Sequence, residues 1–468
     1  MNVTPKKKLS FRWLRSAGLA WLVTGTLLPI AGVGLYVERE SVAQYLDTHA
    51  TASPHVIVLS SDDWGGLPPR ESAADIKALA DTLRQCRDSM DRPAVLTAYM
   101  IPCEPDLQRM AAQAGQADQA KQADQASHAY SYSCRFAYAN QEEITALWRK
   151  LVAEGTVEIG FHGRDHWNGP LYLDLLRTQA AYRDAMAQGT IPYRGDAAYD
   201  KLLAVDDRMK YLQRSYIDAS TSPPHALPLA MQRILTAQGL DELRLHMGVA
   251  PAIAVAPGHV WDTVTCQALK AEGIDYLETV PLPVLAPDSD GLLVPTGETA
   301  GYFSHPGQIN IVVRTDGYEP AWQKAPVSVN KHLWALRQSL ACGVPAVVSL
   351  HKASFVGPDE AAKAQARSDL RDLLTMARQE FPDLVFLSAS DLGRYMYGHG
   401  DQANRKVDFA RADLNGPEQL TVTIKALWLC HAKFRVFVYV FCASLTWATV
   451  VSFMSIRRKK LDVETDKA

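Results

Sequence analysis

The chain has 468 residues, of which 47% are hydrophobic and 21% are charged, and its formal net charge is −3. This is the composition of a globular protein, long enough for one large domain or two medium ones. Because the net charge is close to zero, no global basic field indicates a nucleic-acid partner.

The first predicted element is an apolar, uncharged segment, residues 16–37, which is long enough to span a bilayer. A cleaved signal peptide is the alternative, but its apolar region is normally shorter, so we expect an uncleaved anchor. The positive-inside rule places the preceding residues, 1–15, in the cytoplasm. Their basic residues are Lys6, Lys7, Lys8, Arg12 and Arg15.

A second apolar segment, residues 436–456, is followed by a basic cytoplasmic tail, 457–468. Two spans of this kind predict an inner (cytoplasmic) membrane protein with an extracytoplasmic or periplasmic central domain. Three basic residues before the second span, Lys425, Lys433 and Arg435, weaken this topology without overturning it. We expect 401–435 to be a linker or a small β extension.

The central domain, residues 50–400, begins with a short apolar run, Val56 to Leu59, which predicts a buried strand. The run leads into two adjacent carboxylates, Asp62 and Asp63, then an aromatic and two glycines. Neighbouring carboxylates at the end of a buried strand repel each other and resist desolvation. A bound cation would account for them, and so would a helix N-cap or a solvated turn.

Residues 73–90 predict a polar helix, and residues 93–100 predict the next strand. A low-complexity insert follows at 104–135, with its most biased part at 110–128. Residues 140–153 predict an amphipathic helix. None of the seven cysteines forms a C-x-x-C pair, so the sequence does not predict a cysteine metal site. Cys103 and Cys134 bracket the insert, and either a disulfide or two free buried thiols would fit there.

Residues 156–167 predict another short strand, and this one ends in a His-x-x-x-His pattern, His162 and His166. Neutral imidazole is the commonest metal-binding side chain. Two histidines and one carboxylate leave a fourth tetrahedral position open, which is the composition of a catalytic zinc site. The pair at one strand end, with the two aspartates at another, favours a metal site.

The remaining chain continues the alternation after a polar, helical insert at 170–222. Polar residues follow several of the predicted strands: His259, Arg314 and Asp316, and His351. Helices are predicted at 229–238, 262–271, 327–341 and 360–379, and strands at 252–255, 274–279, 310–313, 345–350 and 384–387.

Alternating strands and helices predict a parallel sheet, and here an α/β fold that closes into an irregular (β/α) barrel of about seven parallel strands. In a barrel the carboxyl ends of all strands meet on one face. We therefore expect the polar residues that follow the strands to converge there.

Three motifs resemble those of the polysaccharide deacetylases of the NodB-like type, the carbohydrate esterase family 4 barrel. Ser60-Ser61-Asp62-Asp63-Trp64-Gly65 is similar to their T-F-D-D-G, His162 to His166 to their H-[ST]-x-x-H, and Ser349-Leu350-His351 to their L-x-H. The resemblance covers residues 54–397 in motif order. It implies a metal-dependent hydrolase that removes N-acetyl or O-acetyl groups from a cell-envelope carbohydrate.

The resemblance also implies roles for individual residues. Asp62 would be the general base and His351 the general acid, while Asp63, His162 and His166 would bind a divalent metal, with zinc preferred. The implied partners are an acetylated polysaccharide or lipid-linked sugar and the membrane. Nucleic acid is not expected, and envelope-assembly partners cannot be named.

The sequence also departs from the family. The family's third motif carries an arginine that contacts the base, whereas Val255 to His259 contains none. Arg164 or Arg314 could substitute, or His259 could use the position differently. Asp316 is the candidate for the carboxylate that tunes the acid histidine.

Other residues leave alternatives open. Gly163 replaces the family's Ser or Thr, and Ser349 replaces a Leu that would help form an acetyl-methyl pocket. Trp64 and Trp167 could stack on sugar rings or simply pack at the barrel rim.

Two other classes of function remain open on the sequence. A glycoside hydrolase would use paired carboxylates across a cleft, for which Asp165, Asp316 and Glu319 are candidates. A non-catalytic glycan-binding or assembly protein could have kept the barrel and lost activity. The missing third-motif arginine is the best support for this last class.

Overall fold

The computed structural model describes residues 51–106, 134–179, 182, 206–280, 283–287, 293–299, 309–322, 328–340, 344–397 and 410–411. All of them belong to one compact unit, Asp47–Asp413. Both predicted spans, both predicted tails and nearly all of the predicted linker lie outside the described residues. Within those ranges, no helix is long and apolar enough to cross a membrane.

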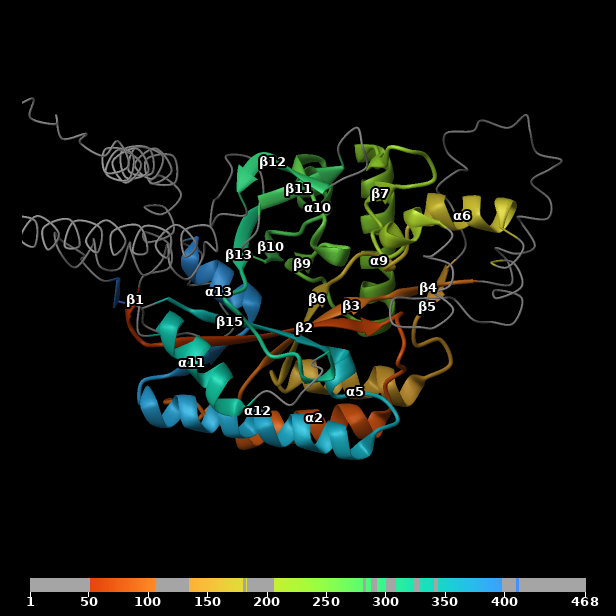
Figure 1. Ribbon diagram of the computed structural model, residues 1–468. Coiled ribbons are helices and arrows are strands. Elements are labelled where there is room, and N and C mark those ends of the chain that lie inside the picture. Colours follow the sequence, from red (N-terminus) through yellow and green to blue (C-terminus); the bar gives the residue numbers. More distant parts are fainter. Residues whose placement is uncertain are drawn as a thin grey trace, which may run out of the picture. The chain divides into compact units, whose positions relative to one another are not determined.

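A parallel sheet forms the centre of this unit (Figure 1). Its strands run in the order β13-β10-β9-β6-β3-β2-β15-β14, with a short strand, β16, that pairs with the start of β2. Their bounds are β2 (Val56–Gly65), β3 (Leu96–Ile101), β6 (Val157–Phe161), β9 (Ile253–Val255), β10 (Tyr276–Thr279), β13 (Asn310–Val313), β14 (Asp316–Gly317), β15 (Ala346–His351) and β16 (Val385–Leu387).

The two outermost strands of this order, β13 and β14, are successive parts of one extended segment, which closes the ring. Asn310 pairs with Tyr276 of β10, and Asp316 pairs with Val348 of β15. Between the two pairs, the Thr315 amide donates to the Val347 carbonyl at 2.9 Å. The parallel α/β half-barrel supports the predicted (β/α) barrel fold.

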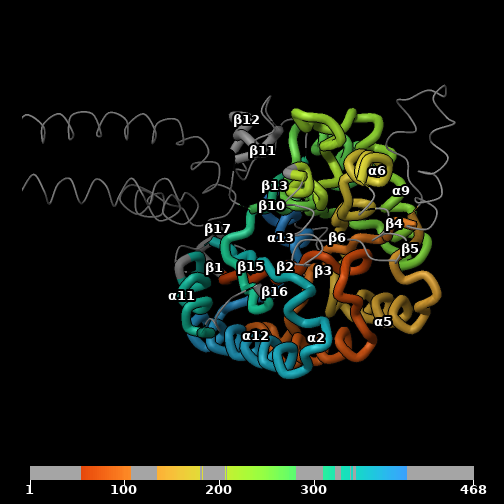
Figure 2. The backbone as a smooth tube through the Cα atoms, turned by 45° about the vertical axis from the view of Figure 1, so that its right-hand side comes forward, coloured from red at the N-terminus to blue at the C-terminus, as the bar shows by residue number. Residues whose placement is uncertain are grey.

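Helices cover the sheet: Figures 1 and 2 place α2, α5 and α12 together on one side of it, and Figure 1 places α9 and α10 on another. They form where polar and apolar residues alternate at helical spacing. Their bounds are α2 (Ala73–Gln85), α5 (Glu142–Ala153), α6 (Gly169–Thr178), α9 (Leu229–Met247), α10 (Thr263–Ala271), α11 (Val329–Leu340), α12 (Glu360–Glu380) and α13 (Ala389–Met396).

Two helix ends differ by five residues or more from those that the sequence predicts. α2 ends at Gln85 rather than Met90, because Cys86 is already extended. α9 continues past the predicted end at Gln238 to Met247. A Cβ on Gly239 would lie 2.7 Å from the Phe161 ring and 2.8 Å from the Arg164 Cα, so this glycine permits close packing against the β6 end.

Short elements complete the described fold. Four antiparallel pairs join β1 (Thr51–Ser53) to β17 (Ala410–Arg411), β4 (Cys103–Pro105) to β5 (Cys134–Phe136), β7 (Ile217–Asp218) to β8 (His225–Ala226), and β11 (Pro283–Pro287) to β12 (Leu293–Thr299). Short 3₁₀ helices lie at Asp207–Tyr211, Pro257–His259, Pro320–Trp322 and Lys352–Ser354. Much of both predicted inserts, 107–133 and 183–205, lies outside the described residues.

The described cysteines are Cys86, Cys103, Cys134 and Cys266, and all four are free thiols in the structure. Of the two alternatives for Cys103 and Cys134, the structure therefore has the thiols. The other three cysteines lie outside the described residues.

Candidate active site

A β-bulge in β2 lets two neighbouring carboxylates serve one site. In a regular strand, adjacent side chains point to opposite faces. Here Ser61 lies opposite Ala98 of β3, but Trp64 lies opposite Met100, so β2 contains one extra residue in between. Asp63 has a φ of 72°, in the left-handed region, as is common in such bulges. Asp62 and Asp63 can thus both contact groups at the carboxyl end of the barrel.

Asp63, His162 and His166 come together at this end of the barrel. One ligand atom from each lies within 4.8 Å of the others. The Asp63 Oδ1 is 3.4 Å from the His162 Nε2 and 3.8 Å from the His166 Nε2. The parallel register explains the meeting, because His162 follows the end of β6, two positions from β2 in the sheet.

Both histidines direct Nε2 toward Asp63. The Nδ1 of His162 lies 2.9 Å from the Val255 carbonyl oxygen, which can only accept, so Nδ1 donates there and leaves Nε2 as the nitrogen available to a metal. Burial, with His162 nearby, lowers the pKa of His166 to about 4. Two neutral imidazoles and one carboxylate are a donor set that fits zinc or a similar divalent ion.

Asp62 forms a bidentate ion pair with Arg314. The guanidinium Nη1 and Nη2 lie 2.8 and 2.6 Å from the two carboxylate oxygens, and both side chains are buried. Burial alone would raise the pKa of Asp62, but the charge and hydrogen bonds of Arg314 hold it far below its usual range. Asp62 is therefore ionised at any physiological pH.

This ion pair identifies which arginine contacts the predicted base. The predicted alternatives were Arg164 and Arg314, and it is Arg314, at the end of β13, that binds Asp62. Arg164 instead donates to Asp165 at 2.7 Å and to Gln238 at 2.7 Å.

Glu278 holds Arg314 from inside the barrel. Its Oε1 accepts from the Arg314 Nε at 2.6 Å, and its Oε2 accepts from the hydroxyls of Ser60 and Tyr99, both at 2.8 Å. Tyr99 fits because Gly160 has no side chain: a Cβ there would lie 2.4 Å from the Tyr99 ring. Glu278 had no role predicted from the sequence, although a charged residue within a buried strand was a usable signal.

His351 is paired with Glu319. The His351 Nδ1 lies 2.6 Å from a Glu319 carboxylate oxygen, and its Nε2 lies 3.8 Å from Asp62. Burial would lower the pKa of His351, but the hydrogen bond to Glu319 and the nearby carboxylates outweigh it and raise the pKa. The protonated imidazolium is therefore favoured, which suits a general acid.

The carboxylate beside His351 is thus Glu319 rather than the predicted Asp316. Asp316 is fixed in β14, and its Oδ2 is buried without a hydrogen-bond partner among the described residues. Burial raises the pKa of Asp316 to about 6. Glu319 lies in the turn after β14, where its longer side chain reaches His351.

His259 lines the other side of Asp62. It has a φ of 54° after a 3₁₀ turn, and its Nε2 lies 3.9 Å from the Asp62 Oδ2. Burial, together with the charge of Arg314, lowers the pKa of His259 to about 3, so its imidazole is neutral. It is placed to hydrogen-bond a group next to Asp62.

Neither predicted tryptophan is exposed for sugar stacking. Trp64 is fully buried, meets Trp148 edge-on at 5.2 Å, and donates from Nε1 to Ser61. Trp167 is 3% exposed and meets Tyr172 edge-on. Both tryptophans therefore pack against other side chains, which was the alternative to stacking on sugar rings.

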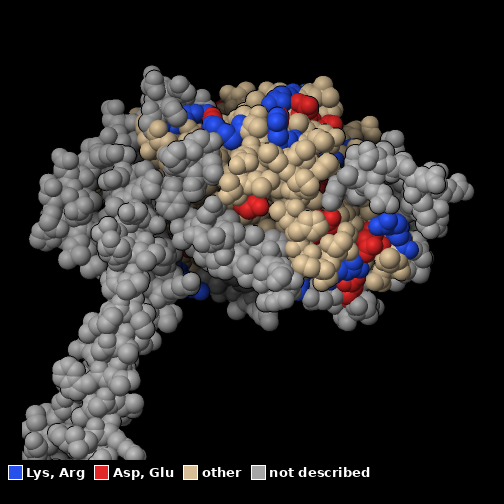
Figure 3. Space-filling view, turned by 90° about the horizontal axis from the view of Figure 1, so that it is seen from above, with Lys and Arg blue, Asp and Glu red and all other residues tan. Residues whose placement is uncertain are grey.

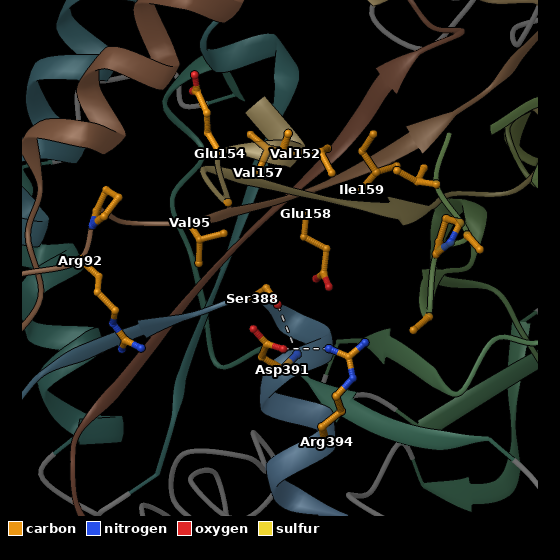
Figure 4. Close-up of a pocket in the computed structure, with 17 residues that line it drawn as sticks. Arg92, Val95, Val152, Glu154, Val157, Glu158, Ile159, Ser388, Asp391 and Arg394 are labelled. Atoms are coloured by element: carbon orange, nitrogen blue, oxygen red, sulfur yellow. Dashed lines mark hydrogen bonds and ion pairs between the residues drawn. The ribbon is translucent and has the colours of Figure 1, made fainter. Parts of the chain in front are cut away.

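A cavity lies at the opposite, amino end of the strands (Figure 4). Its volume is about 600 Å³, and Glu158, Asp391 and Arg394 line it. The Glu158 carboxylate accepts from Thr97 and Ser390, while Arg394 donates to Asp391 at 2.8 Å. Burial raises the pKa of Glu158. This cavity was not predicted from the sequence.

On the surface seen in Figure 3, described acidic and basic side chains occur close to one another, and uncharged residues form the larger area. The strong charges of the candidate site, Asp62 and Arg314, are buried inside the barrel instead.

No family model matches the sequence, and no curated protein matches it. Several solved structures are similar at low identity. The 4-alpha-glucanotransferase from Thermococcus litoralis is 12% identical with a TM-score of 0.38, over 73% of this chain and only 40% of that protein. A protein from Mycobacterium smegmatis assigned as a polysaccharide deacetylase is 12% identical with a TM-score of 0.36, over 78% and 98%.

The alpha-amylase AmyC from Thermotoga maritima is 9% identical with a TM-score of 0.34, over 87% of this chain and 94% of that protein. Carbohydrate esterases of family 4 are also among the similar structures. The activities named for these proteins differ, and TM-scores of 0.38 or less carry no weight in choosing between them. The function proposed below therefore depends on the geometry of the site.

Proposed function

We propose that this chain is a divalent-metal-dependent deacetylase that hydrolyses an acetyl amide or ester on a carbohydrate of the cell envelope. One observation carries the proposal: the Asp63, His162 and His166 cluster lies beside an ionised carboxylate, Asp62, and a histidine with a raised pKa, His351. Pairs of titrating groups with oppositely tuned protonation are what acid–base hydrolysis requires.

The residues divide the reaction between them. A divalent ion held by the cluster would supply Lewis acidity toward the acetyl carbonyl and acidify the attacking water. Asp62, kept ionised by Arg314, accepts the proton that the water loses as it attacks the carbonyl carbon. His351 donates its Nε2 proton to the departing amine or alcohol, and Glu319 stabilises the imidazolium before that transfer.

The choice of substrate and location has separate support. The acetylated carbohydrate follows from the motif resemblance, which does not separate N-acetyl from O-acetyl groups. The cell-envelope location follows from the predicted spans at 16–37 and 436–456, which lie outside the described residues. Zinc is the proposed metal because two imidazoles and one carboxylate form its usual catalytic donor set.

Two contacts weaken the other classes of function. Two of the carboxylates considered for a glycoside hydrolase are already paired, Asp165 with Arg164 and Glu319 with His351. The hypothesis of a glycan-binding protein without activity was supported by the absence of the third-motif arginine. Arg314, which follows a different strand, supplies a guanidinium to Asp62 instead.

Metal content of the purified full chain is the primary test. Wild type should contain about one divalent ion per chain, because the site offers three ligands at one point. His166→Ala should lose the ion. His225→Ala, which removes a histidine whose side chain is 55% exposed, should retain it. Retention of the ion in His166→Ala, or no ion in wild type, would contradict the proposal.

Activity and location need their own measurements. Wild type should release acetate from acetylated glycans, and a chelator should stop the release until metal is restored. For location, residues near 398 should be cleaved by a protease added outside intact spheroplasts. Protection of that region until the membrane is broken would contradict the extracytoplasmic placement.

A further inference from the structure

The hairpin of β4 and β5 brings two cysteines onto one face. In its register Cys103 lies opposite Phe136, Glu104 opposite Arg135, and Pro105 opposite Cys134. Because side chains alternate along each strand, Cys103 and Cys134 share a face as diagonal neighbours. The other face carries an ion pair between Glu104 and Arg135 at 2.6 Å, to which Arg70 also contributes.

The two thiols are close enough to interact. Cys103 is buried, with 1% of its surface exposed, whereas Cys134 is half-buried. The interaction with Cys103 lowers the pKa of Cys134, which increases the share of its thiolate, while it raises the pKa of Cys103.

The backbone of Cys103 supports both loops of the candidate metal site. Its amide donates to the Arg164 carbonyl at 2.9 Å, and Arg164 lies between the two metal-binding histidines. On the other side it packs against Gly66, three residues after Asp63: a Cβ on Gly66 would lie 2.3 Å from the Cys103 carbonyl oxygen. The backbone of Cys103 therefore contacts both segments that carry the three ligands.

We propose that Cys103 and Cys134 form a reversible disulfide that fixes the hairpin and, through Cys103, the loops that carry the metal ligands. The effect on the metal rests on the proposed function, whereas formation of the bond does not. The bond would also close the chain segment between the two cysteines at its base, which restricts the unfolded chain.

The chemistry needs a disulfide oxidant such as oxidised glutathione. The Cys134 thiolate attacks one sulfur of the oxidant, forming a mixed disulfide and releasing one glutathione thiolate. The Cys103 thiolate then attacks the Cys134 sulfur and releases the second glutathione. The two protons from the cysteine thiols pass to the released thiolates, so two thiols become one disulfide and two glutathione molecules are formed.

Peptide mapping of the full chain under non-reducing conditions tests the bond itself. After treatment with oxidised glutathione, wild type should yield a linked peptide pair that contains Cys103 and Cys134 and is two hydrogens lighter than the separate peptides. Cys134→Ser should not yield it. Cys86→Ser, which removes another buried thiol, should yield the same pair as wild type. Recovery of both cysteines as free thiols, or linked to other cysteines, would overturn the proposal.

A Co²⁺ titration tests the effect on the metal site. Oxidised wild type should bind Co²⁺ roughly tenfold more tightly than reduced wild type, the size of effect expected from groups that support ligands. Cys134→Ser should match reduced wild type and ignore oxidant. Equal affinities in both redox states would overturn the link to the metal, as would thiolate-to-cobalt absorption in the reduced protein. Loss of binding in both states would instead count against the metal site, leaving the mapped disulfide unaffected.

Discussion

Two carboxylates face the inside of the barrel near its opposite ends, and their surroundings differ: Asp62 is buried, whereas Glu158 is half-buried. Glu158, near the amino ends of the strands, is held by neutral donors from Thr97 and Ser390. Asp62, at the carboxyl ends, is held by the guanidinium of Arg314. Burial favours the neutral form of both groups, but only Asp62 has a cation against it. The pKa of Glu158 is therefore raised and that of Asp62 is lowered.

The difference separates a carboxyl group that lines a cavity and is favoured in its neutral form from one that is kept charged. A buried charge is costly, and Arg314 is itself held by Glu278 below it. This chain of buried charges ends at Asp62, next to His351 and the candidate metal ligands. The arrangement at Glu158 has no such extension among the described residues. A cavity lined by a half-buried acid thus does not suffice for a hydrolytic site.

The largest expected effect is on turnover. Asp62→Asn keeps the size of the side chain but removes the proton acceptor, so acetate release should fall roughly 10²- to 10⁴-fold. Glu158→Gln makes the same kind of change at the other end of the barrel and should leave turnover within a few-fold of wild type. Steady-state kinetics on one acetylated glycan would compare the two variants.

Metal content provides the control for that pair. Both variants should retain the ion, because neither Asp62 nor Glu158 belongs to the ligand cluster. Full turnover in Asp62→Asn would remove Asp62 as the base. An equal loss in both variants would mean that the two ends of the barrel are not functionally distinct.

The next effect is on stability. Arg314→Met removes the cation between two buried carboxylates, Asp62 and Glu278, and should lower the free energy of unfolding by about 3–5 kcal/mol. Arg394→Met at the other end breaks the ion pair with one carboxylate, Asp391, rather than with two, so its cost should be smaller. Urea denaturation of both variants beside wild type measures the difference. Equal losses of unfolding free energy in the two variants would mean that the ion pairs of Arg314 contribute no more to stability than the ion pair of Arg394.

Local patterns predicted much of the fold and the metal cluster. Short apolar runs, each followed by polar residues, indicated the strands of the ring, because a parallel strand that is buried on both faces consists mainly of apolar residues. The cluster could be predicted because its ligands lie at or just beyond the carboxyl ends of two strands: Asp63 in the last part of β2, and His162 and His166 after β6. Parallel strands bring such positions together without any further information.

The partners of Asp62 and His351 could not be predicted in the same way. They depend on how the segment 310–317 closes the ring, which sets where Arg314 and Glu319 lie relative to β2 and β15. A one-residue change in that register would exchange the inward and outward side chains. Nothing local distinguishes Glu319 from Asp316. Likewise Gly239 is a helix breaker by propensity, and only the packing against Phe161 explains its place within α9.

A smaller effect is expected on the pH dependence. Glu319 raises the pKa of His351 by accepting its Nδ1 proton in a hydrogen bond, so Glu319→Gln should lower that pKa. His351 must be protonated to donate, and activity is lost as pH rises through its pKa. The alkaline limb of kcat/KM should therefore move to lower pH in Glu319→Gln. Asp316→Asn is the matched control and should leave the limb in place. A shift in Asp316→Asn alone would return the role to Asp316.

The smallest effect concerns stability against pH, and its sign differs between the two ends. Glu158 has a raised folded pKa, so its contribution to stability is complete below the unfolded pKa and is lost as pH rises through the folded value. Asp62 has a lowered folded pKa, so its contribution is complete above the unfolded pKa and is lost only as pH falls through the folded value.

Denaturation between about pH 5 and pH 8 can separate the two cases, because Asp62 is ionised throughout this window in both states. The difference in unfolding free energy between wild type and Asp62→Asn should stay constant. As pH rises, the unfolding free energy of wild type should fall relative to that of Glu158→Gln, because burial opposes an increasingly ionised Glu158. The reverse pattern, with a pH-dependent difference at Asp62 and a constant one at Glu158, would mean that Arg314 does not hold Asp62 in its charged form.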